Sequence, residues 1–278
     1  MRYALLLLAM LLLTACSPSG IEQRAGYAVD TRHVAYGARP RVKVLVIHYT
    51  AEDFSGSLAT LTDRQVSVHY LIPEQPPRQR GKPLIWQLVP EQQLAWHAGP
   101  SYWRGATRIN DTSIGIELVN TGYTRGLTGK VWTPFHPAQI AALQPLVRDI
   151  AQRYHIRPEN IVGHSDIAPQ RKQDPGPLFP WAQLAQQGLG AWPDAPRVRF
   201  WLAGRAPSQP VEQAELLAVL ARYGYDVNMQ MSDTQQRNVI AAFQMHFRPA
   251  DYRGEADAET LAIAQALVEK YGAFDGGS

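Results

Sequence analysis

One short stretch concentrates residue types that could bind a metal and catalyse hydrolysis. Residues 161–176 contain His164, Asp166, Lys172 and Asp174 in a segment broken by Pro and Gly. Two apolar residues lead into the stretch, which is typical of a short strand that opens into a loop. Zinc is commonly bound by His nitrogen and carboxylate oxygen, so His164 and Asp174 are candidate ligands.

A third ligand must come from elsewhere in the chain. Residues 42–50 form a nearly continuous apolar, β-branched run, which predicts a strand buried on both faces. His48 lies at the end of this run and is the best-placed third ligand. A buried His that is merely hydrogen-bonded is the alternative.

Glu117 is a single carboxylate inside another predicted strand, residues 112–120. Burying a carboxylate costs several kcal/mol unless it is paired or protonated. Apolar surroundings raise the pKa of a carboxyl group, and a general base near neutral pH needs a raised pKa. An outward-facing Glu on a half-exposed strand is the alternative.

The elements that must position these residues predict an α/β fold. Strands are expected at 66–72, 84–89 and 161–162, and helices at 54–61 and 133–154, with Pro145 expected to kink or split the longer helix. This order indicates a mixed central β-sheet flanked by helices. Helices at 211–223, 233–247 and 257–271 predict a small three-helix bundle. The expected boundaries are a sheet domain at 37–185, a linker at 186–204 and the bundle at 205–278.

The N-terminus predicts a lipoprotein. A charged start, a short apolar run and small residues before Cys16 make a secretory signal, and the run is too short to span a bilayer. Leu-Thr-Ala-Cys16 resembles a bacterial lipobox, in which the Cys is lipidated, although an ordinary signal peptide with an incidental Cys is the alternative. Ser17 then favours the outer membrane. We expect a signal peptide at 1–15, a tether at 16–36 and an outer-membrane lipoprotein facing the periplasm.

The composition fits a folded protein, which we expect to be a monomer. With 45% hydrophobic and 18% charged residues the chain is not of the disordered class. Its net charge of +3 is too weak to indicate nucleic acid, so no nucleic-acid partner is expected.

Four motifs, taken together, resemble one enzyme family. His48-Tyr-Thr, Trp96-His-Ala-Gly, Ser113-Ile-Gly-Ile-Glu and, at 163–176, Gly-His-Ser-Asp-Ile-Ala-Pro-x-Arg-Lys-x-Asp-Pro-Gly follow in this order. The order resembles the zinc-dependent N-acetylmuramoyl-L-alanine amidases of the type-2 amidase and peptidoglycan-recognition family. The resemblance covers roughly residues 30–185, and its last motif is the most specific.

The resemblance implies a zinc site and a reaction. Zinc would be held by His48, His164 and Asp174, with a fourth position open for water. Glu117 would take the water's proton and pass it to the leaving amine, and Lys172 would share the oxyanion with the zinc. The bond cut would join the lactyl group of (anhydro-)N-acetylmuramic acid to L-Ala of the stem peptide, in peptidoglycan or muropeptides.

Three further residues are predicted to contact substrate, each with a structural alternative. They are Tyr70, on a strand that passes near the groove in the family, His97 and Arg171. Asp166 is expected either to orient the neighbouring ligand or to cap a turn. His246 belongs to no motif and is expected at the surface or at a helix end.

The C-terminal helices resemble a peptidoglycan-binding three-helix domain. Phe243-Gln244 and the pattern Gly254-x-x-Asp257-x-x-Thr260 carry this resemblance. The segment Met229-Gln-Met231 departs from it, because a Gly would be usual there. The bundle is therefore expected either to bind glycan or to pack on the catalytic domain as a structural element.

Three alternatives compete with the amidase prediction. Some recognition-family members bind peptidoglycan without cutting it. A metallopeptidase could cut within the stem peptide, but no His-Glu-x-x-His motif is present. A purely structural wall-anchoring lipoprotein would not need Glu117 and Lys172 in these motifs.

Overall fold

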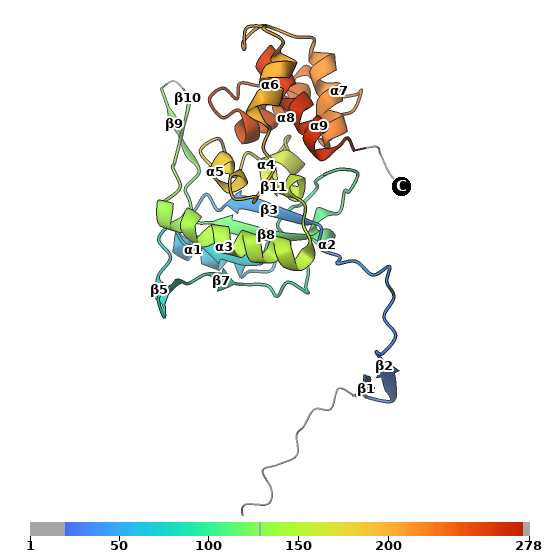
Figure 1. Cartoon of the computed structure of the whole chain (residues 1–278). Helices are drawn as coiled ribbons and strands as arrows, with labels where there is room; N and C mark the ends of the chain where they lie inside the picture. The colour runs from blue at the N-terminus through green and yellow to red at the C-terminus, as the bar shows by residue number, and fades with distance from the viewer. Residues whose placement is uncertain (1–19, 128, 275–278) are drawn as a thin grey trace, which may run out of the picture. The chain divides into compact units, whose positions relative to one another are not determined.

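The computed structural model describes residues 20–127 and 129–274, and its contacts divide the chain into two units after Pro40 (Figure 1). In the first unit, β1 (Ile21–Arg24) and β2 (Tyr27–Asp30) form an exposed antiparallel hairpin within the predicted tether. The predicted signal peptide and Cys16 lie outside the described residues. Among the described helices, none has the length and apolar character needed to cross a bilayer.

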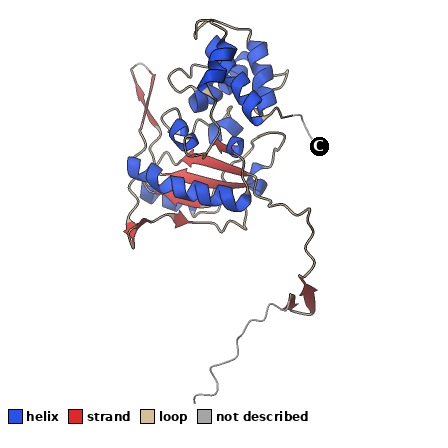
Figure 2. Cartoon of the chain, viewed as in Figure 1, coloured by secondary structure: helices blue, strands red, loops and turns tan. Residues whose placement is uncertain are grey.

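The second unit is built on a five-stranded mixed sheet, which confirms the predicted fold class (Figure 2). Four neighbouring strands are parallel, and the edge strand β7 runs antiparallel to β4. The order across the sheet is β11 (Ile161–Gly163), β3 (Val44–Tyr49), β8 (Ser113–Leu118), β4 (Tyr70–Ile72) and β7 (Trp86–Gln87). The strand expected at 66–72 is shorter than predicted, because Ser67 bonds to the backbone of Trp96 in a loop instead.

Helix α3 (Pro137–Tyr154) covers one face of the sheet. Its apolar side, including Leu143 and Val147, packs against Leu45 and Ile47 of β3. Pro137 begins the helix, where a missing backbone N–H costs nothing. The expectation that Pro145 splits the helix is wrong, because α3 runs through it. Packing of the apolar side on the sheet outweighs the one backbone hydrogen bond that a proline removes.

The opposite face of the sheet shares a core with the C-terminal bundle. Val44, Val46 and Val162 of the strands belong to the same apolar cluster as the bundle's buried residues, such as Leu220 and Phe243. The short helices α4 (His164–Ile167) and α5 (Trp181–Ala185) lie between the sheet and the bundle (Figure 1). The bundle comprises α7 (Gln213–Tyr223), α8 (Asp233–Phe247) and α9 (Ala258–Tyr271), close to the predicted ranges.

The stretch 186–204, expected to be a linker, contains helix α6 (Ala195–Leu202). This helix packs along α9, where Arg197 pairs with Glu269 at 2.9 Å. Sheet domain, α6 and bundle thus form one compact unit from Arg41 onward.

Helix α1 (Phe54–Leu61) packs near β4, where Leu61 and Leu71 share a small apolar cluster. Its first turn is capped by Asp53, whose side chain accepts a hydrogen bond from Gly56 N–H. The remaining elements are short: β5 (Arg78–Gln79), β6 (Lys82–Pro83), α2 (Ile109–Thr112), β9 (Tyr123–Gly126), β10 (Gly129–Trp132) and a 3-10 turn (Pro158–Asn160).

A buried polar contact also joins the bundle to the sheet domain. Asp166 of α4 accepts hydrogen bonds from Gly163 N–H at 2.7 Å and from the Tyr225 hydroxyl at 2.5 Å. Its Oδ2 lies 2.7 Å from Nδ1 of His246, whose ring stacks on Trp181. His246 lies in the last turn of α8, at a helix end as one of its two predictions had it, but it is only 3% exposed and so does not lie at the surface. Asp166 ties helix α4 to the bundle rather than orienting the neighbouring His164.

Candidate active site

The chemistry-bearing residues meet where three parallel strands end. His48 lies near the end of β3, Glu117 near the end of β8, and His164 directly after β11. β3 and β8 pair in a register that places His48 opposite Glu117. The carboxyl ends of parallel strands share one edge of a sheet, and this edge is where such folds bind ligands. The topology therefore brings together residues that lie far apart in the sequence.

Three potential ligand atoms converge at this edge. Nδ1 of His48 lies 2.9 Å from Nδ1 of His164, and Oδ2 of Asp174 lies 3.1 Å and 3.0 Å from these two nitrogens. All three side chains are buried. Two imidazole nitrogens and one carboxylate oxygen are a donor set that suits zinc.

The protonation of the cluster suits a cation as well. Burial and the neighbouring His164 lower the pKa of His48 to about 4, although Asp174 opposes the shift, so the His48 imidazole is neutral at pH 7. Burial alone would raise the pKa of Asp174, but the two histidines hold it far below its ordinary value. Metal ligands must be deprotonated, and both of these groups meet that condition.

Glu117 stands beside the cluster, and one of its carboxylate oxygens is unpaired among the described residues. Within the described part of the chain, its Oε2 is buried and has no hydrogen-bond partner. Burial and repulsion by Asp174 raise the pKa of Glu117 well above its ordinary value, against the attraction of Lys172. A polar atom left unpaired in this way costs free energy, and such strain is common at catalytic positions.

A cavity of about 150 Å³ opens onto the cluster. Glu117, Lys172, His164 and Asp174 line it, together with Tyr49 and Trp96. Trp96 is 58% exposed, which is unusual for so large an apolar side chain. The sequence reasoning missed Tyr49 and Trp96, although both stand next to a motif His and that adjacency was a usable signal.

His97 lies at this cavity, but both of its ring nitrogens are engaged by the protein. Nδ1 is 3.0 Å from Nε2 of His48, and Nε2 is 3.1 Å from the Ser113 hydroxyl. These contacts are to other protein groups, so the predicted contact of His97 with substrate stays a prediction.

The structure does not bring Tyr70 to the site. Tyr70 pairs with Ile116 and packs in the cluster beneath α3, on the opposite face of the sheet from His48. Its hydroxyl donates to Glu91 at 2.6 Å, and Glu91 also binds Arg153 and Tyr154 of α3. This position corrects the expectation that Tyr70 contacts substrate, because side chains alternate between the two faces of a strand.

Arg171 holds a loop. Its guanidinium donates to the carbonyl oxygens of Ala98 and Pro100, both at 2.8 Å. It also lines an open groove of about 680 Å³ with Lys172 and Arg125, so a role beside substrate stays a prediction.

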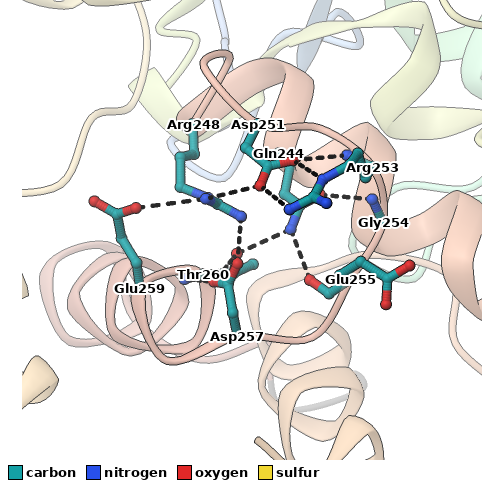
Figure 3. Close-up of polar contacts among 9 residues, drawn as sticks. All are labelled: Gln244, Arg248, Asp251, Arg253, Gly254, Glu255, Asp257, Glu259 and Thr260. Carbon is teal, nitrogen blue, oxygen red and sulfur yellow. Dashed lines mark hydrogen bonds and ion pairs between the residues drawn. The ribbon is translucent and has the colours of Figure 1, made fainter. Parts of the chain in front are cut away.

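The motif that suggested glycan binding forms a closed cluster inside the bundle (Figure 3). Gln244 donates to Thr260 and to the Glu255 carbonyl, and it accepts from Gly254 N–H. Asp257 accepts from both the N–H and the hydroxyl of Thr260. These groups satisfy one another and hold the start of α9, so the motif has a structural role here.

Comparison with known proteins agrees with this geometry. The sequence pattern of the N-acetylmuramoyl-L-alanine amidase family matches residues 38–177. The N-acetylmuramoyl-L-alanine amidase AmiD of Escherichia coli strain K12 is 67% identical over 272 residues, which cover 98% of this chain and 99% of that protein. The chain therefore belongs to the N-acetylmuramoyl-L-alanine amidase family.

Solved structures support the same assignment. The complex of E. coli AmiD with the substrate anhydro-N-acetylmuramic acid-L-Ala-D-γ-Glu-L-Lys has a TM-score of 0.89 at 69% identity, covering 91% of this chain and 98% of that one. AmpDh3 of Pseudomonas aeruginosa, in complex with anhydromuramic pentapeptide, has a TM-score of 0.79 at 40% identity, covering 87% and 97%. This chain is an amidase that cuts the bond between N-acetylmuramic acid and L-alanine, and the prediction of an N-acetylmuramoyl-L-alanine amidase is confirmed.

Proposed function

We propose that this amidase takes muropeptides, in the anhydro or the ordinary muramic form, and separates the lactyl group from L-Ala with the help of a bound zinc ion. The observation that carries the proposal is Oε2 of Glu117, which is buried and unpaired among the described residues, beside three converging ligand atoms. The anhydromuramic peptides bound to the two similar solved structures support this substrate class.

His48, His164 and Asp174 would hold the zinc. His164 Nε2 lies 3.2 Å from the carbonyl oxygen of Ala98, which can only accept, so the ring proton sits on Nε2 and Nδ1 is left as a free ligand. When bound, zinc supplies Lewis acidity, which polarises the scissile carbonyl and makes the attacking water more acidic. The carboxylate of Asp174 provides the negative charge of the ligand set.

Glu117 would move the proton. It takes a proton from the attacking water and delivers it to the departing L-Ala nitrogen, because an amine leaves only once it is protonated. Burial raises the pKa of Glu117, so the carboxyl group can hold the proton between these two events. Since Oε2 has no partner among the described residues, it is free to bond to the water.

Lys172 would stabilise the transition state. Its side chain lines the same cavity as Glu117 and two of the candidate ligands, His164 and Asp174. An ammonium group at this place offsets the negative charge that develops on the carbonyl oxygen, where such donors typically contribute about 100- to 1,000-fold in rate.

We further propose that lipidation of Cys16 anchors the enzyme as a monomer to the outer membrane, facing the peptidoglycan. The support is the order of residues 1–17: a charged start, an apolar run and Leu-Thr-Ala-Cys-Ser. A Cys16→Ser variant should be released from membranes, and mass spectrometry should then find no acyl groups on the N-terminus. Persistence of this variant in the outer-membrane fraction would contradict the anchor.

The test of the reaction uses the chain from Ser17 onward and purified muropeptides. We expect a free peptide that begins with L-Ala, lost after chelation and restored by zinc. A His164→Ala variant is the control, because it should lose zinc and activity together. Cleavage inside the stem peptide, or full activity without any metal, would overturn the proposal.

A further inference from the structure

One dipeptide, His97–Ala98, contacts both candidate zinc histidines at the ring nitrogen that is not a candidate ligand. His48 Nε2 lies 3.0 Å from the ring Nδ1 of His97, and His164 Nε2 lies 3.2 Å from the carbonyl oxygen of Ala98. In each histidine the ring nitrogen that faces away from the ligand cluster is therefore engaged by this dipeptide. A metal-ligating His is usually oriented by the partner of its other nitrogen.

The dipeptide is itself fixed in place. The backbone N–H groups of both residues donate to Oδ1 of Asn110, at 3.2 Å for His97 and 2.8 Å for Ala98. The His97 ring lies against Gly115 of β8, where an added Cβ would come within 2.6 Å of the ring. Only a glycine leaves room for the ring there, so the sheet, too, is built around the position of His97.

The hydrogen bonds allow only one proton arrangement that suits a metal. A His48 that offers Nδ1 as a ligand must carry its proton on Nε2. That proton needs an acceptor, and Nδ1 of His97 stands at hydrogen-bond distance. His97 must then carry its own proton on Nε2, where the Ser113 hydroxyl oxygen can accept it at 3.1 Å.

The reverse arrangement would block the site. If His97 donated from Nδ1, the proton of neutral His48 would sit on its own Nδ1, among the ligand atoms of His164 and Asp174. The carbonyl oxygen of Ala98 can only accept, so it always places the proton of His164 on Nε2. The imidazole of His97 can either donate or accept. The tautomer of His48 therefore depends on which residue stands at position 97 and on the hydrogen bonds that this residue makes.

We propose that His97 is a positioning residue: held by Asn110 and Ser113, it fixes the tautomer and orientation of His48 for metal binding. The inference rests on the proposed zinc function. It assigns His97 to the side of His48 that faces away from the ligand cluster, rather than to the substrate.

The test compares two variants of the full chain by zinc affinity, measured in competition with a chromophoric chelator. In His97→Asn, the amide oxygen can stand near the place of the ring Nδ1 and accept the proton of His48. His97→Leu has a similar size but no acceptor. We expect the Leu variant to bind zinc about 10- to 100-fold more weakly, and the Asn variant to recover most of that loss. Unfolding of both metal-free variants controls for lost packing.

A second measurement needs no variant. In the zinc-loaded wild-type chain, ¹⁵N chemical shifts should place the protons of both His48 and His97 on Nε2. A proton on Nδ1 of His97, or a Leu variant that binds zinc as tightly as the wild type, would overturn this inference alone. A wild-type chain that binds no zinc would overturn the proposed function and this inference together.

Discussion

Two buried polar clusters in this molecule look alike in composition and differ in how their groups are paired. The cluster at the strand ends brings two imidazole nitrogens and a carboxylate oxygen within 3.1 Å of one another, and Glu117 beside it has an unpaired oxygen. In the bundle cluster of Figure 3, most donors meet acceptors: Arg248 faces Asp257 at 2.6 Å, and Gln244 bonds on both ends of its amide. Among the described residues of this cluster, one buried side-chain nitrogen, Nε of Arg248, has no partner.

This difference in pairing distinguishes a cluster that binds a ligand from a cluster that stabilises the fold. Acceptors that face one another need a cation or protons from outside, so the first cluster is complete only with a ligand. A cluster that satisfies its own groups stabilises the fold and has little left to offer a ligand. Both clusters coincide with family motifs, which shows that a motif in the sequence does not by itself distinguish binding from structure.

Glu117→Gln should have the largest effect and tests the incomplete cluster directly. The amide keeps the size of the side chain but cannot accept the water's proton, so kcat should fall about 1,000-fold or more. Zinc content and the free energy of unfolding should hold or rise, because the neutral amide removes the repulsion between Glu117 and Asp174. Rates on muropeptides, metal analysis and denaturant unfolding measure these three quantities. A rate within tenfold of the wild type would contradict the role.

Lys172→Met should lower kcat about 100- to 1,000-fold, because it removes a charge that acts in the transition state. KM should change much less, since the substrate's ground state carries little charge on the carbonyl oxygen. Steady-state kinetics separate the two parameters. A change confined to KM would mean that Lys172 binds substrate instead.

Asp257→Ala should have the opposite effect to the two substitutions above: it should lower the free energy of unfolding and leave kcat unchanged. It removes the cap of α9 and the partner of a nearly buried Arg248, so the free energy of unfolding should fall by about 3 kcal/mol. Activity per folded molecule should stay within twofold. Arg253→Ala is the matched control, because Arg253 is exposed and solvent screens its ion pair with Asp251, so the free energy of unfolding should barely change. A large loss of kcat in Asp257→Ala would contradict the purely structural role of the bundle cluster.

Glu91 extends the comparison to a third buried carboxylate, one that is fully paired. Burial would raise the pKa of Glu91, but Arg153, Tyr70 and Tyr154 lower it to about 2, below its ordinary 4.5. As the pH falls, Glu91 is therefore protonated at a higher pH in the unfolded chain than in the folded chain. The stabilisation is present above about pH 4.5 and disappears toward pH 2.

The expected size is on the order of 2 kcal/mol, reduced from the full shift because Arg153 is partly exposed. Denaturant unfolding of the wild type and Glu91→Gln at several pH values measures it. The difference between the two should shrink from pH 5 to pH 2.5. Parallel curves would mean that Glu91 contributes nothing through its charge.

Local patterns predicted the main elements because their causes are local. The apolar run around β3 and the helical spacing of α8 are set by neighbouring residues, and both elements lie where expected. Which strands are neighbours is not local information. The parallel pairing of β3 with β8, which places His48 beside Glu117, follows from crossovers that no short segment encodes.

The predictions that were wrong depended either on which face of a strand a residue occupies or on a partner far away in the sequence. His69 and Tyr70 are adjacent, yet Tyr70 faces α3 while His69 accepts from Gly115 in the interior. A shift of one residue reverses the face, and the short strand offered too few residues to fix it. His246 was expected at the surface or at a helix end, and its burial could not be foreseen because its partner Asp166 lies 80 positions away.

The contacts of Asp166 limit how this enzyme can be cut and recombined. The family pattern ends at residue 177, which suggests a separable catalytic module. A fragment that ended there would lack Tyr225 and His246 and would leave the Asp166 carboxylate, two residues from His164, without two of its partners. A chimaera that exchanges the bundle should therefore bring an equivalent hydroxyl and imidazole, or replace Asp166 as well. The unit of exchange is set by this carboxylate rather than by the boundary of the motif.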